Sequence, residues 1–333
     1  MRQATFSSCS LSRRVALAAI AMAGMSLNAL AQAQVAYPAR PIRLVVGYAP
    51  GGSVDMAARI FADMLAKSLN ATVVVDNVSG AAGVVGAQRV VNAVPDGYTL
   101  LVGSSNELAA TKLVNPAQKY DPLQDLTPIG LLATAPVLWV AGPHVPARTL
   151  EEFLALVKNH PGKYSYGSSG VGSTLHFAAE LLKQQARLKI THVPYKGTAA
   201  LTSDLAGGTL DFAMVSPTAA VPFIQGGRIM PLGVTSAARL PILPQVPALG
   251  EAAALKGYEL NGWFAVAGPR KLPADITQKL AAALQQGLHN PDFRKRFEAA
   301  GTVPANQPQE LAQLMRVDSR KYAELVKFAD MKE

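Results

Sequence analysis

Two glycine-rich turns, each placed between a short apolar strand and a helix, constrain this chain more than any other feature of its sequence. The first spans residues 47–55 and the second residues 167–174, so that one lies in each half of the 333-residue chain. Strand-to-helix turns are the basic connections of α/β proteins, and ligands bind at such turns outside the carboxyl ends of the strands. The pair predicts a two-lobe protein that holds a small anion between two helix N-termini.

The first 33 residues have the three parts of a cleaved secretory signal. Three arginines precede an apolar run over residues 15–25, which is too short to span a bilayer, and the small-residue triplet 31–33 follows. We predict export to the periplasm with cleavage after Ala33, or alternatively after Ala31. The arginine pair at 13–14 leaves twin-arginine export open as a minority option.

The composition of the mature chain is that of a globular protein. The whole sequence is 50% hydrophobic and 16% charged, and its net charge of +9 falls to +6 when the three signal arginines are removed. The basic residues are dispersed and aromatic residues make up only 6% of the chain, which argues against nucleic-acid binding. The single cysteine, Cys9, lies in the signal, so the mature chain has no thiol or disulfide chemistry.

Strands and helices alternate along the mature chain, with apolar residues at helical spacing in the helices and short apolar runs in the strands. The expected strands are residues 42–47, 72–75, 98–103, 163–166, 189–193, 210–215 and 229–235. The expected helices are 53–69, one ending at 94 after three glycines, one opened by a capping box of Thr149 and Glu152, 173–186, 198–206, one beginning at Pro273, and one from Pro308 to about residue 328. This alternation implies parallel sheets covered by helices on both faces.

Two longer extended stretches divide the chain into lobes. Residues 128–142 are nearly continuously apolar and long enough to pass from one lobe into the other, and residues 258–267 provide the return. We expect residues 34–134 and 262–333 to form lobe I and residues 135–261 to form lobe II. The result is a clamshell with a hinge of two crossing strands.

The chemistry of the two turns suits a carboxylate. Their glycines let the backbone approach a ligand, and the helices that follow present unsatisfied N–H groups and a positive dipole end. The second turn adds three serines and a threonine. Either turn alone is more often structural, and Ser173 can serve simply as a helix cap; the hypothesis depends on one turn in each lobe.

Several ordered motifs resemble the Bug receptors, the periplasmic binding components of tripartite tricarboxylate transporters. The motifs that carry the resemblance are Tyr-Pro-Ala-Arg-Pro-Ile-Arg at 37–43, Pro-Gly-Gly at 50–52 with Asp55, the glycines from 80 to 86, Pro-Asp-Gly-Tyr-Thr-Leu at 95–100, residues 164–172, His-Val-Pro-Tyr-Lys-Gly at 192–197, Leu-Ala-Gly-Gly at 205–208, Arg239 with residues 244–247, and the Trp263 strand. The match covers essentially the whole mature chain. It departs from the family at residues 48–50, Tyr-Ala-Pro, where members often have a phenylalanine and two prolines.

The resemblance implies an α/β two-lobe periplasmic binding protein of type II that closes on a small carboxylate or related solute and delivers it to membrane transporter subunits. It implies that the two turns grip the carboxylate, that Ser104 and Ser105 add side-chain contacts, and that residues 211–217 line the far wall. The candidate ligand-binding residues are Tyr48, Ala49, Gly51, Gly52, Ser53, Asp55, Ser104, Ser105, Ser168, Ser169, Gly170, Gly172, Ser173, Thr174, Lys196, Asp211 and Ser216. No cofactor or metal is expected, and we expect a monomer.

Some of these residues have two interpretations. Asp55 either stabilises the helix terminus or organises ligand and water. Asp211 either binds an amino group or, slightly favoured, caps local backbone. Lys196 contacts the ligand or stays solvated, and His176, beside the serines, is expected to be packed or hydrogen-bonded rather than chemically active.

Two other classes of function are alternatives to a solute receptor. A periplasmic hydrolase is the weaker alternative, because the sequence has no Gly-x-Ser-x-Gly elbow, His-Glu-x-x-His motif or Walker A lysine, and its five histidines lack metal-ligand spacing. We therefore predict no enzymatic activity. A solute sensor for a signalling partner would use the same ligand-induced closure, so the sequence leaves that alternative open.

Overall fold

The computed structural model describes residues 37–116, 118–307 and 311–331. The expected signal, its cleavage after Ala33 and the helix start at Pro308 lie outside the described residues. Residues from Arg40 onward belong to one unit, separate from the residues up to Ala39. No helix in the described part of the chain is both long and apolar enough to cross a membrane.

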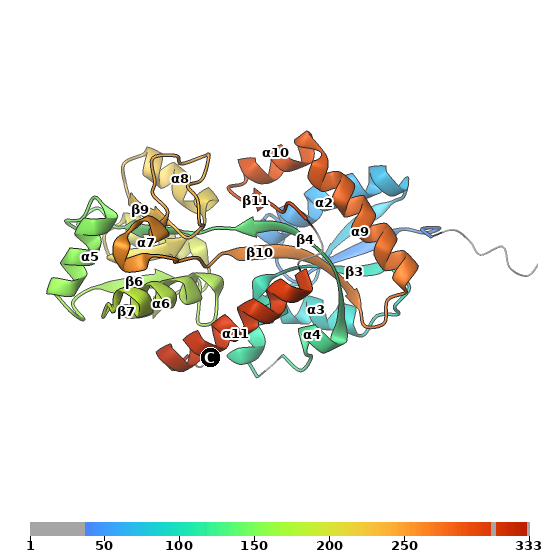
Figure 1. Cartoon of the computed structure of the whole chain (residues 1–333), viewed down its shortest axis with the longest axis horizontal. Helices are drawn as coiled ribbons and strands as arrows, with labels where there is room; N and C mark the ends of the chain where they lie inside the picture. The colour runs from blue at the N-terminus through green and yellow to red at the C-terminus, as the bar shows by residue number, and fades with distance from the viewer. Residues whose placement is uncertain (1–36, 117, 308–310, 332–333) are drawn as a thin grey trace, which may run out of the picture. The chain divides into compact units, whose positions relative to one another are not determined.

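The first sheet contains six strands among the described residues, in the order β11-β4-β10-β3-β1-β2 (Figure 1). The strands are β1 (Ile42–Val46), β2 (Val73–Asn77), β3 (Thr99–Ser104), β4 (Leu126–Ala135), β10 (Gly262–Pro269) and β11 (Val303–Pro304). β1 pairs in parallel with β2 and β3, whereas β10 runs antiparallel to both β3 and β4. This sheet therefore combines strands from both ends of the described chain.

The second sheet has the order β7-β6-β8-β5-β9. Its strands are β5 (Leu138–Ala141), β6 (Ser165–Ser168), β7 (Thr191–Pro194), β8 (Phe212–Val215) and β9 (Met230–Val234). β6 pairs in parallel with β7 and β8, while β5 is antiparallel to β8 and β9. All five strands come from one continuous segment, residues 138–234, which begins with the end of the first extended stretch and finishes before the second.

The prediction of parallel sheets is wrong for the strands at the crossings. β4 ends at Ala135 and β5 begins at Leu138, so the chain passes from one sheet into the other without a helix between them. A helical crossover is what forces successive strands of one sheet to be parallel, and a strand that enters directly is free of this constraint. Both sheets are consequently mixed, in a fold that is still α/β and two-lobed.

The helices at the two glycine-rich turns begin at the predicted residue or one residue after it. α2 (Ser53–Leu69) and α7 (Thr198–Ala206) have the expected bounds, and α6 (Thr174–Ala186) begins one residue later because Ser173 is its N-cap. The remaining helices are α3 (Val84–Val91), α4 (Pro122–Asp125), α5 (Leu150–Asn159), α8 (Pro217–Gln225), α9 (Ala274–His289), α10 (Pro291–Ala299) and α11 (Leu311–Ala329). Close backbone packing explains one glycine, since a Cβ on Gly86 of α3 would lie 2.6 Å from the Gly47 Cα after β1.

The capping box predicted at the start of α5 forms only in part. The Thr149 hydroxyl accepts a hydrogen bond from the Glu152 N–H (3.1 Å), as expected of an N-cap. The Glu152 carboxylate, however, accepts from the N–H of Arg148 (2.6 Å), one residue before the position that the motif requires.

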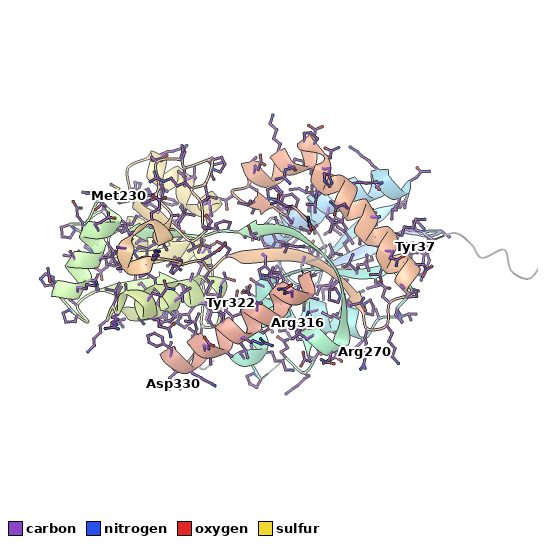
Figure 2. The ribbon with its side chains drawn as sticks, in the orientation of Figure 1. Tyr37, Met230, Arg270, Arg316, Tyr322 and Asp330 are labelled. Atoms are coloured by element: carbon purple, nitrogen blue, oxygen red, sulfur yellow. The ribbon has the colours of Figure 1, made fainter. Side chains whose placement is uncertain are left out.

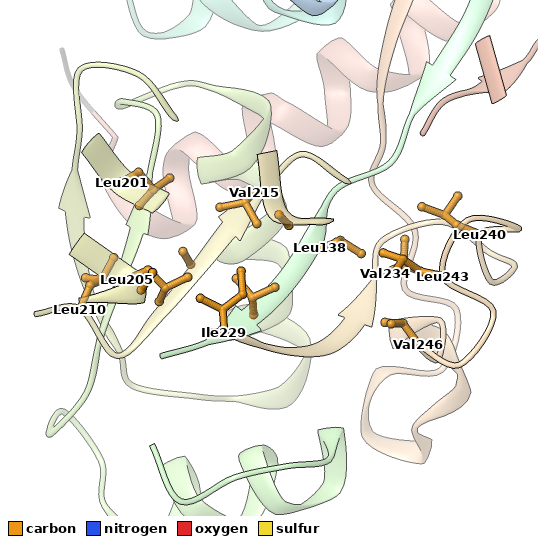
Figure 3. Packing of buried hydrophobic residues seen from close by; sticks show 14 of the residues in the cluster. Leu138, Leu201, Leu205, Leu210, Val215, Ile229, Val234, Leu240, Leu243 and Val246 are labelled. Atoms are coloured by element: carbon orange, nitrogen blue, oxygen red, sulfur yellow. The ribbon is translucent and has the colours of Figure 1, made fainter. Parts of the chain in front are cut away.

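Each sheet has its own buried side chains. On the second sheet, an aliphatic cluster joins Leu138 of β5 and Val215 of β8 to Leu201 and Leu205 of α7 (Figure 3). The fully buried Trp139 alternates with Leu138 along β5 and packs on the opposite face of this sheet, with Phe212 stacked at 5.4 Å between ring centroids. Tyr322 of α11, labelled in Figure 2, lies 4.5 Å from the Phe177 ring of α6.

Candidate functional site

The first glycine-rich turn connects β1 to the N-terminus of α2. Residues 49–53 are exposed, and Gly52 occupies the N-cap position of α2 without any side-chain capping bond. The N–H groups at the start of a helix have no partner within the helix. Since no side chain caps α2, these N–H groups and the exposed Ser53 hydroxyl can donate to an anion outside the helix.

Asp55 holds the first turn in place through its buried carboxylate. Its buried carboxylate accepts hydrogen bonds from the Gly51 N–H (2.9 Å), Arg59 Nε (2.8 Å) and Asn77 Nδ2 (2.9 Å). Burial opposes ionisation, but these bonds outweigh it and lower the pKa of Asp55 to about 2. With three donors already bound, the carboxylate acts as a stabiliser of the loop, which is the first of its two sequence interpretations.

A buried carboxylate orients the hydroxyl groups of Tyr48 and Ser104. Ser104 donates to Glu107 through both its N–H (2.8 Å) and its hydroxyl (2.6 Å). The Tyr48 hydroxyl lies 2.8 Å from Glu107 Oε2 and 2.9 Å from the Ala82 carbonyl, so its single proton is directed at one of these acceptors. Both hydroxyls therefore donate into the protein, and neither offers its proton to a ligand.

Glu107 was missed in the sequence, and its environment is unusual. The side chain is fully buried, and this burial raises the pKa of its carboxyl even though the bonds from Ser104 and Tyr48 favour the charged form. Burial, followed by the charge of Glu107, also raises the pKa of Tyr48. Glu107 lies three residues after Ser104, in the π-helix η2 (Asn106–Ala110). The spacing of apolar residues does not predict a π-helix, so the contact between Glu107 and Ser104 was not expected.

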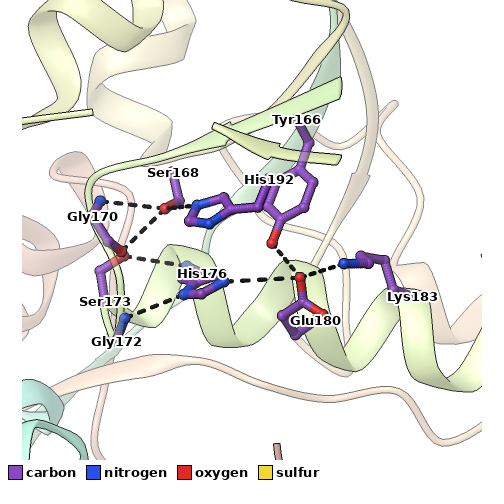
Figure 4. A network of polar contacts seen from close by, with 9 residues as sticks. All are labelled: Tyr166, Ser168, Gly170, Gly172, Ser173, His176, Glu180, Lys183 and His192. Carbon is purple, nitrogen blue, oxygen red and sulfur yellow. Dashed lines mark hydrogen bonds and ion pairs between the residues drawn. The ribbon is translucent and has the colours of Figure 1, made fainter. Parts of the chain in front are cut away.

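The second turn connects β6 to α6 and is ordered by its own serines (Figure 4). Ser173 caps α6 by accepting from the His176 N–H (3.2 Å) and donates to the Gly170 carbonyl (2.8 Å). The fully buried Ser168 contacts the Gly170 carbonyl (3.1 Å) and His192 Nε2 (2.7 Å). Ser169, half-buried between them, has no recorded side-chain hydrogen bond in the described structure.

Asn106 joins the two predicted turns and is the main residue that sequence reasoning missed. Its Oδ1 accepts from Thr174 of the second turn through both the N–H (3.3 Å) and the hydroxyl (3.0 Å). Its Nδ2 donates to the Tyr48 hydroxyl of the first turn (3.4 Å). The hydroxyls of Ser105 and Thr174 lie 3.1 Å apart beside it. The signal that could have found Asn106 is its place as the next polar residue after the two serines at the carboxyl end of β3.

Of the remaining candidates, Asp211 lies away from the two turns, whereas Ser216 and Lys196 lie at the strand-to-helix junctions where the sequence predicts them. Asp211 lies before β8 and accepts from the Ser165 N–H (2.8 Å) and hydroxyl (2.9 Å) at the amino end of β6. Ser168 stands at the opposite end of β6, so Asp211 is separated from the two turns and caps local backbone. Ser216 is the N-cap of α8 at the carboxyl end of β8, and Lys196 is exposed in the turn between β7 and α7.

The hydroxyl and imidazole contacts do not form a catalytic pair. Ser173 meets the backbone N–H of His176, while the ring Nδ1 of His176 accepts from the Gly172 N–H (3.2 Å). Ser168 does contact a histidine ring, but its side chain is fully buried. Within the described residues, no group of three or more histidine, cysteine or acidic side chains is arranged to hold a metal ion.

The comparisons with known proteins point to one family. Residues 57–331 match the family model described as tripartite tricarboxylate transporter family receptor. The chain resembles Rpa4515 of R. palustris with adipate (TM-score 0.78, 32% identity, 89% of this chain and 99% of that chain). It also resembles the periplasmic binding protein BugD (TM-score 0.74, 31% identity, 89% of this chain and 99% of that chain). A third similar structure is MatC (Rpa3494) from Rhodopseudomonas palustris with bound malate (TM-score 0.73, 32% identity, 87% of this chain and 100% of that chain).

Proposed function

The chain belongs to the tripartite tricarboxylate transporter receptor family, a family of periplasmic solute-binding proteins, and we propose that it binds a small carboxylate between its lobes and delivers it to transporter membrane subunits. Its relatives support a dicarboxylate in particular, because the structures of Rpa4515 and MatC contain adipate and malate. The proposed receptor is exported, is cleaved after Ala33 and has no enzymatic activity.

We propose that residues 34–134 and 262–333 form lobe I and residues 135–261 form lobe II. The distribution of the strands supports these boundaries, since β4 ends at Ala135, β10 begins at Gly262, and all strands of the second sheet lie between them. The hinge then consists of the connection from β4 to β5 and the segment that enters β10.

The observation that carries the proposal is the Asn106 bridge. Asn106 contacts Tyr48 of the first turn and Thr174 of the second, although these residues come from opposite halves of the chain. These contacts support our proposal that the uncapped N-terminus of α2 and the serine-rich turn face one ligand site. A hydrogen bond to a charged group contributes about 1.5 to 3 kcal/mol, so four or five donors would approach the ~8 kcal/mol of a micromolar complex before entropic costs.

The proposed contacts divide the candidates into two groups. In the first group, the carboxylate is contacted directly. The contacts come from the N–H groups at the start of helix α2 and from the hydroxyls of Ser53 and Ser169. Tyr48, Asp55, Ser104 and Ser168 hold the turns in place through the internal bonds described above.

A thermal-shift screen of the mature protein tests the proposal. Monocarboxylates, dicarboxylates including adipate and malate, tricarboxylates, aromatic acids and amino acids are compared, because a ligand that binds the native state raises the melting temperature. Titration calorimetry then measures Kd for the best ligand. Ser53→Ala combined with Ser169→Ala should raise this Kd about tenfold, whereas Ser165→Ala, at the other end of β6, should leave it within about twofold. A panel without any hit overturns the proposal.

Experiments in cells test whether the protein delivers its ligand to the membrane subunits of a transporter. Deletion of the gene should abolish uptake of the identified carboxylate while transcription of neighbouring genes stays unchanged. Unchanged uptake together with altered transcription of neighbouring genes would establish the sensor alternative. Turnover of the carboxylate by the purified protein would establish the hydrolase alternative. Light scattering of the purified protein should give the mass of one chain.

A further inference from the structure

Three aromatic rings are stacked beneath the second turn (Figure 4). Tyr166 of β6 lies on His192 of β7 with 4.9 Å between ring centroids, and His192 lies on His176 of α6 with 3.8 Å between centroids and 13° between planes. The rings come from three different elements. His176 is buried and His192 is half-buried, so the stack is part of the interior of the second lobe.

Each imidazole holds one part of the turn. His176 Nδ1 accepts a hydrogen bond from the Gly172 N–H (3.2 Å), just before α6. His192 Nε2 contacts the Ser168 hydroxyl (2.7 Å), which in turn accepts from the Gly170 N–H (3.3 Å). The two rings are thus attached to both ends of the segment that carries Ser169.

The hydrogen bonds fix the charge state of His176. An imidazole nitrogen accepts a hydrogen bond only when it carries no proton, so His176 is neutral with its proton on Nε2, 3.8 Å from Glu180 Oε1. The charged and titratable groups recorded around the stack are Glu180 and Lys183 of α6 and Tyr166 of β6. Lys183 Nζ lies 2.6 Å from Glu180 Oε1, and Tyr166 donates to the same oxygen.

A positive charge is disfavoured in this stack. Burial, then the neighbouring His192 and Lys183, lowers the pKa of His176 to about 3. Burial, then Lys183, lowers the pKa of His192 to about 4. Two imidazolium rings in such close contact would also repel each other.

We propose that His176 and His192 are positioning residues of the second turn: as a neutral stacked pair they hold the Gly172 N–H and the Ser168 hydroxyl, and so keep the turn in the form that binds a carboxylate. Protonation of the pair removes the acceptor for Gly172 and releases the turn. The inference rests on the proposed carboxylate-binding function and adds to it a dependence on two residues that do not touch the ligand.

Paired variants test the role of each nitrogen. In His176→Asn, the side-chain oxygen replaces Nδ1 as an acceptor, whereas His176→Leu removes it. In His192→Gln, a polar atom remains near the position of Nε2, whereas His192→Leu removes it. His160→Leu at the exposed C-cap of α5 is the control. The measurements are hydrogen exchange of the Gly172 amide by NMR, corrected for its intrinsic pH dependence, and Kd for the carboxylate with the largest thermal shift.

We expect His176→Leu to accelerate Gly172 exchange and to raise Kd, each about tenfold, and His176→Asn to restore both to within about threefold. His192→Leu should raise Kd similarly and His192→Gln should restore it, while the His160 variant changes neither quantity. In the wild type, corrected Gly172 exchange should be flat from pH 8 to 5 and rise as the pH falls towards 3, where His176 takes up its proton, and His176→Asn should abolish this rise.

The outcomes separate this inference from the function on which it rests. Unchanged Gly172 exchange in His176→Leu, or faster exchange with unchanged Kd, overturns the positioning role. If His176→Leu fails to fold, the pH profile of the wild type against His176→Asn decides the question. If no carboxylate binds, the proposed function fails, and the exchange measurements still decide whether the pair holds the turn.

Discussion

At the scale of single residues, the turn before α2 depends on one carboxylate. Asp55 binds Gly51, Arg59 and Asn77 at once, and Asn77 also donates to the Tyr48 carbonyl (3.0 Å). A buried group with this many partners fixes the shape of a loop whose own residues are exposed. Asp55 therefore holds the loop from which the uncapped N-terminus of α2 begins.

Asp55→Ala should destabilise the protein by about 1 to 3 kcal/mol at pH 7, because the donors on Gly51, Arg59 and Asn77 lose a charged and buried acceptor. The folded pKa of about 2 lies below the ordinary 3.8, so the contribution of Asp55 is complete above pH 3.8 and is lost as the pH falls towards 2. Urea unfolding at pH 7 and near pH 2 measures the difference, which should disappear in acid. Asp63→Ala, an exposed residue paired with Arg296, is the control and should change stability little.

Asn106→Ala should raise the carboxylate Kd about tenfold, because it removes Oδ1, which accepts hydrogen bonds from both the N–H and the hydroxyl of Thr174. Asn106→Asp keeps an acceptor but adds a negative charge, so it should weaken anion binding even more. Calorimetry on both variants measures the effect, with Asn159→Ala at the exposed end of α5 as the control. Equal affinity of Asn106→Ala and the wild type would contradict a role for the bridge.

At the scale of elements, the turn before α6 packs closely against the residue that follows η3 (Thr111–Leu113). Gly172 has φ +70, and a Cβ added there would lie 2.3 Å from Val114 Cγ2. A side chain at this position would thus collide with Val114, in addition to the backbone strain of a positive φ.

Gly172→Ala should raise Kd at least tenfold, since the new methyl group pushes the turn away from Val114. Gly162→Ala is a matched control, because Gly162 has φ +77 but a Cβ there would have no atom within 4 Å. Calorimetry compares the two variants, and both should lose similar stability from backbone strain alone. An equal effect of both on Kd would show that the contact with Val114 has no role in binding.

At the scale of the whole molecule, the stacked histidines make stability depend on pH. Their folded pKa values of about 3 and 4 lie below the ordinary 6.5, so the unfolded chain binds protons first and stability falls as the pH drops from 6.5 towards 4. Burial raises the pKa of Glu107 and of Asp318, which works in the opposite direction as these carboxyls take up protons in the folded state.

The double variant His176→Asn, His192→Gln isolates the histidine contribution. Its melting temperature should fall less than that of the wild type between pH 6.5 and 4.5, because each buried neutral histidine contributes a slope of up to about 1.4 kcal/mol per pH unit. Calorimetric melting at a series of pH values measures the two slopes. Parallel curves would show that other groups dominate acid sensitivity.

The sequence predicted local features well and long-range contacts poorly. The bounds of α2 follow from the 3.6-residue period and those of α7 agree as well, and the family and the two-lobe fold are confirmed. The antiparallel direction of β10 was not predicted, because strand direction depends on how distant segments pair. Likewise, the Tyr48 hydroxyl could not be assigned its partner Glu107, 59 residues away, from local pattern alone.

The position of β10 between β3 and β4 affects the order in which the chain can acquire its structure during synthesis. A nascent polypeptide that stops before Gly262 already contains every strand of the second sheet, whereas its first sheet is split into two pieces with unpaired edges. The sheet that contains the first strand of the chain, β1, can therefore be completed only after β10 has been made, by which point every strand of the second sheet is already present.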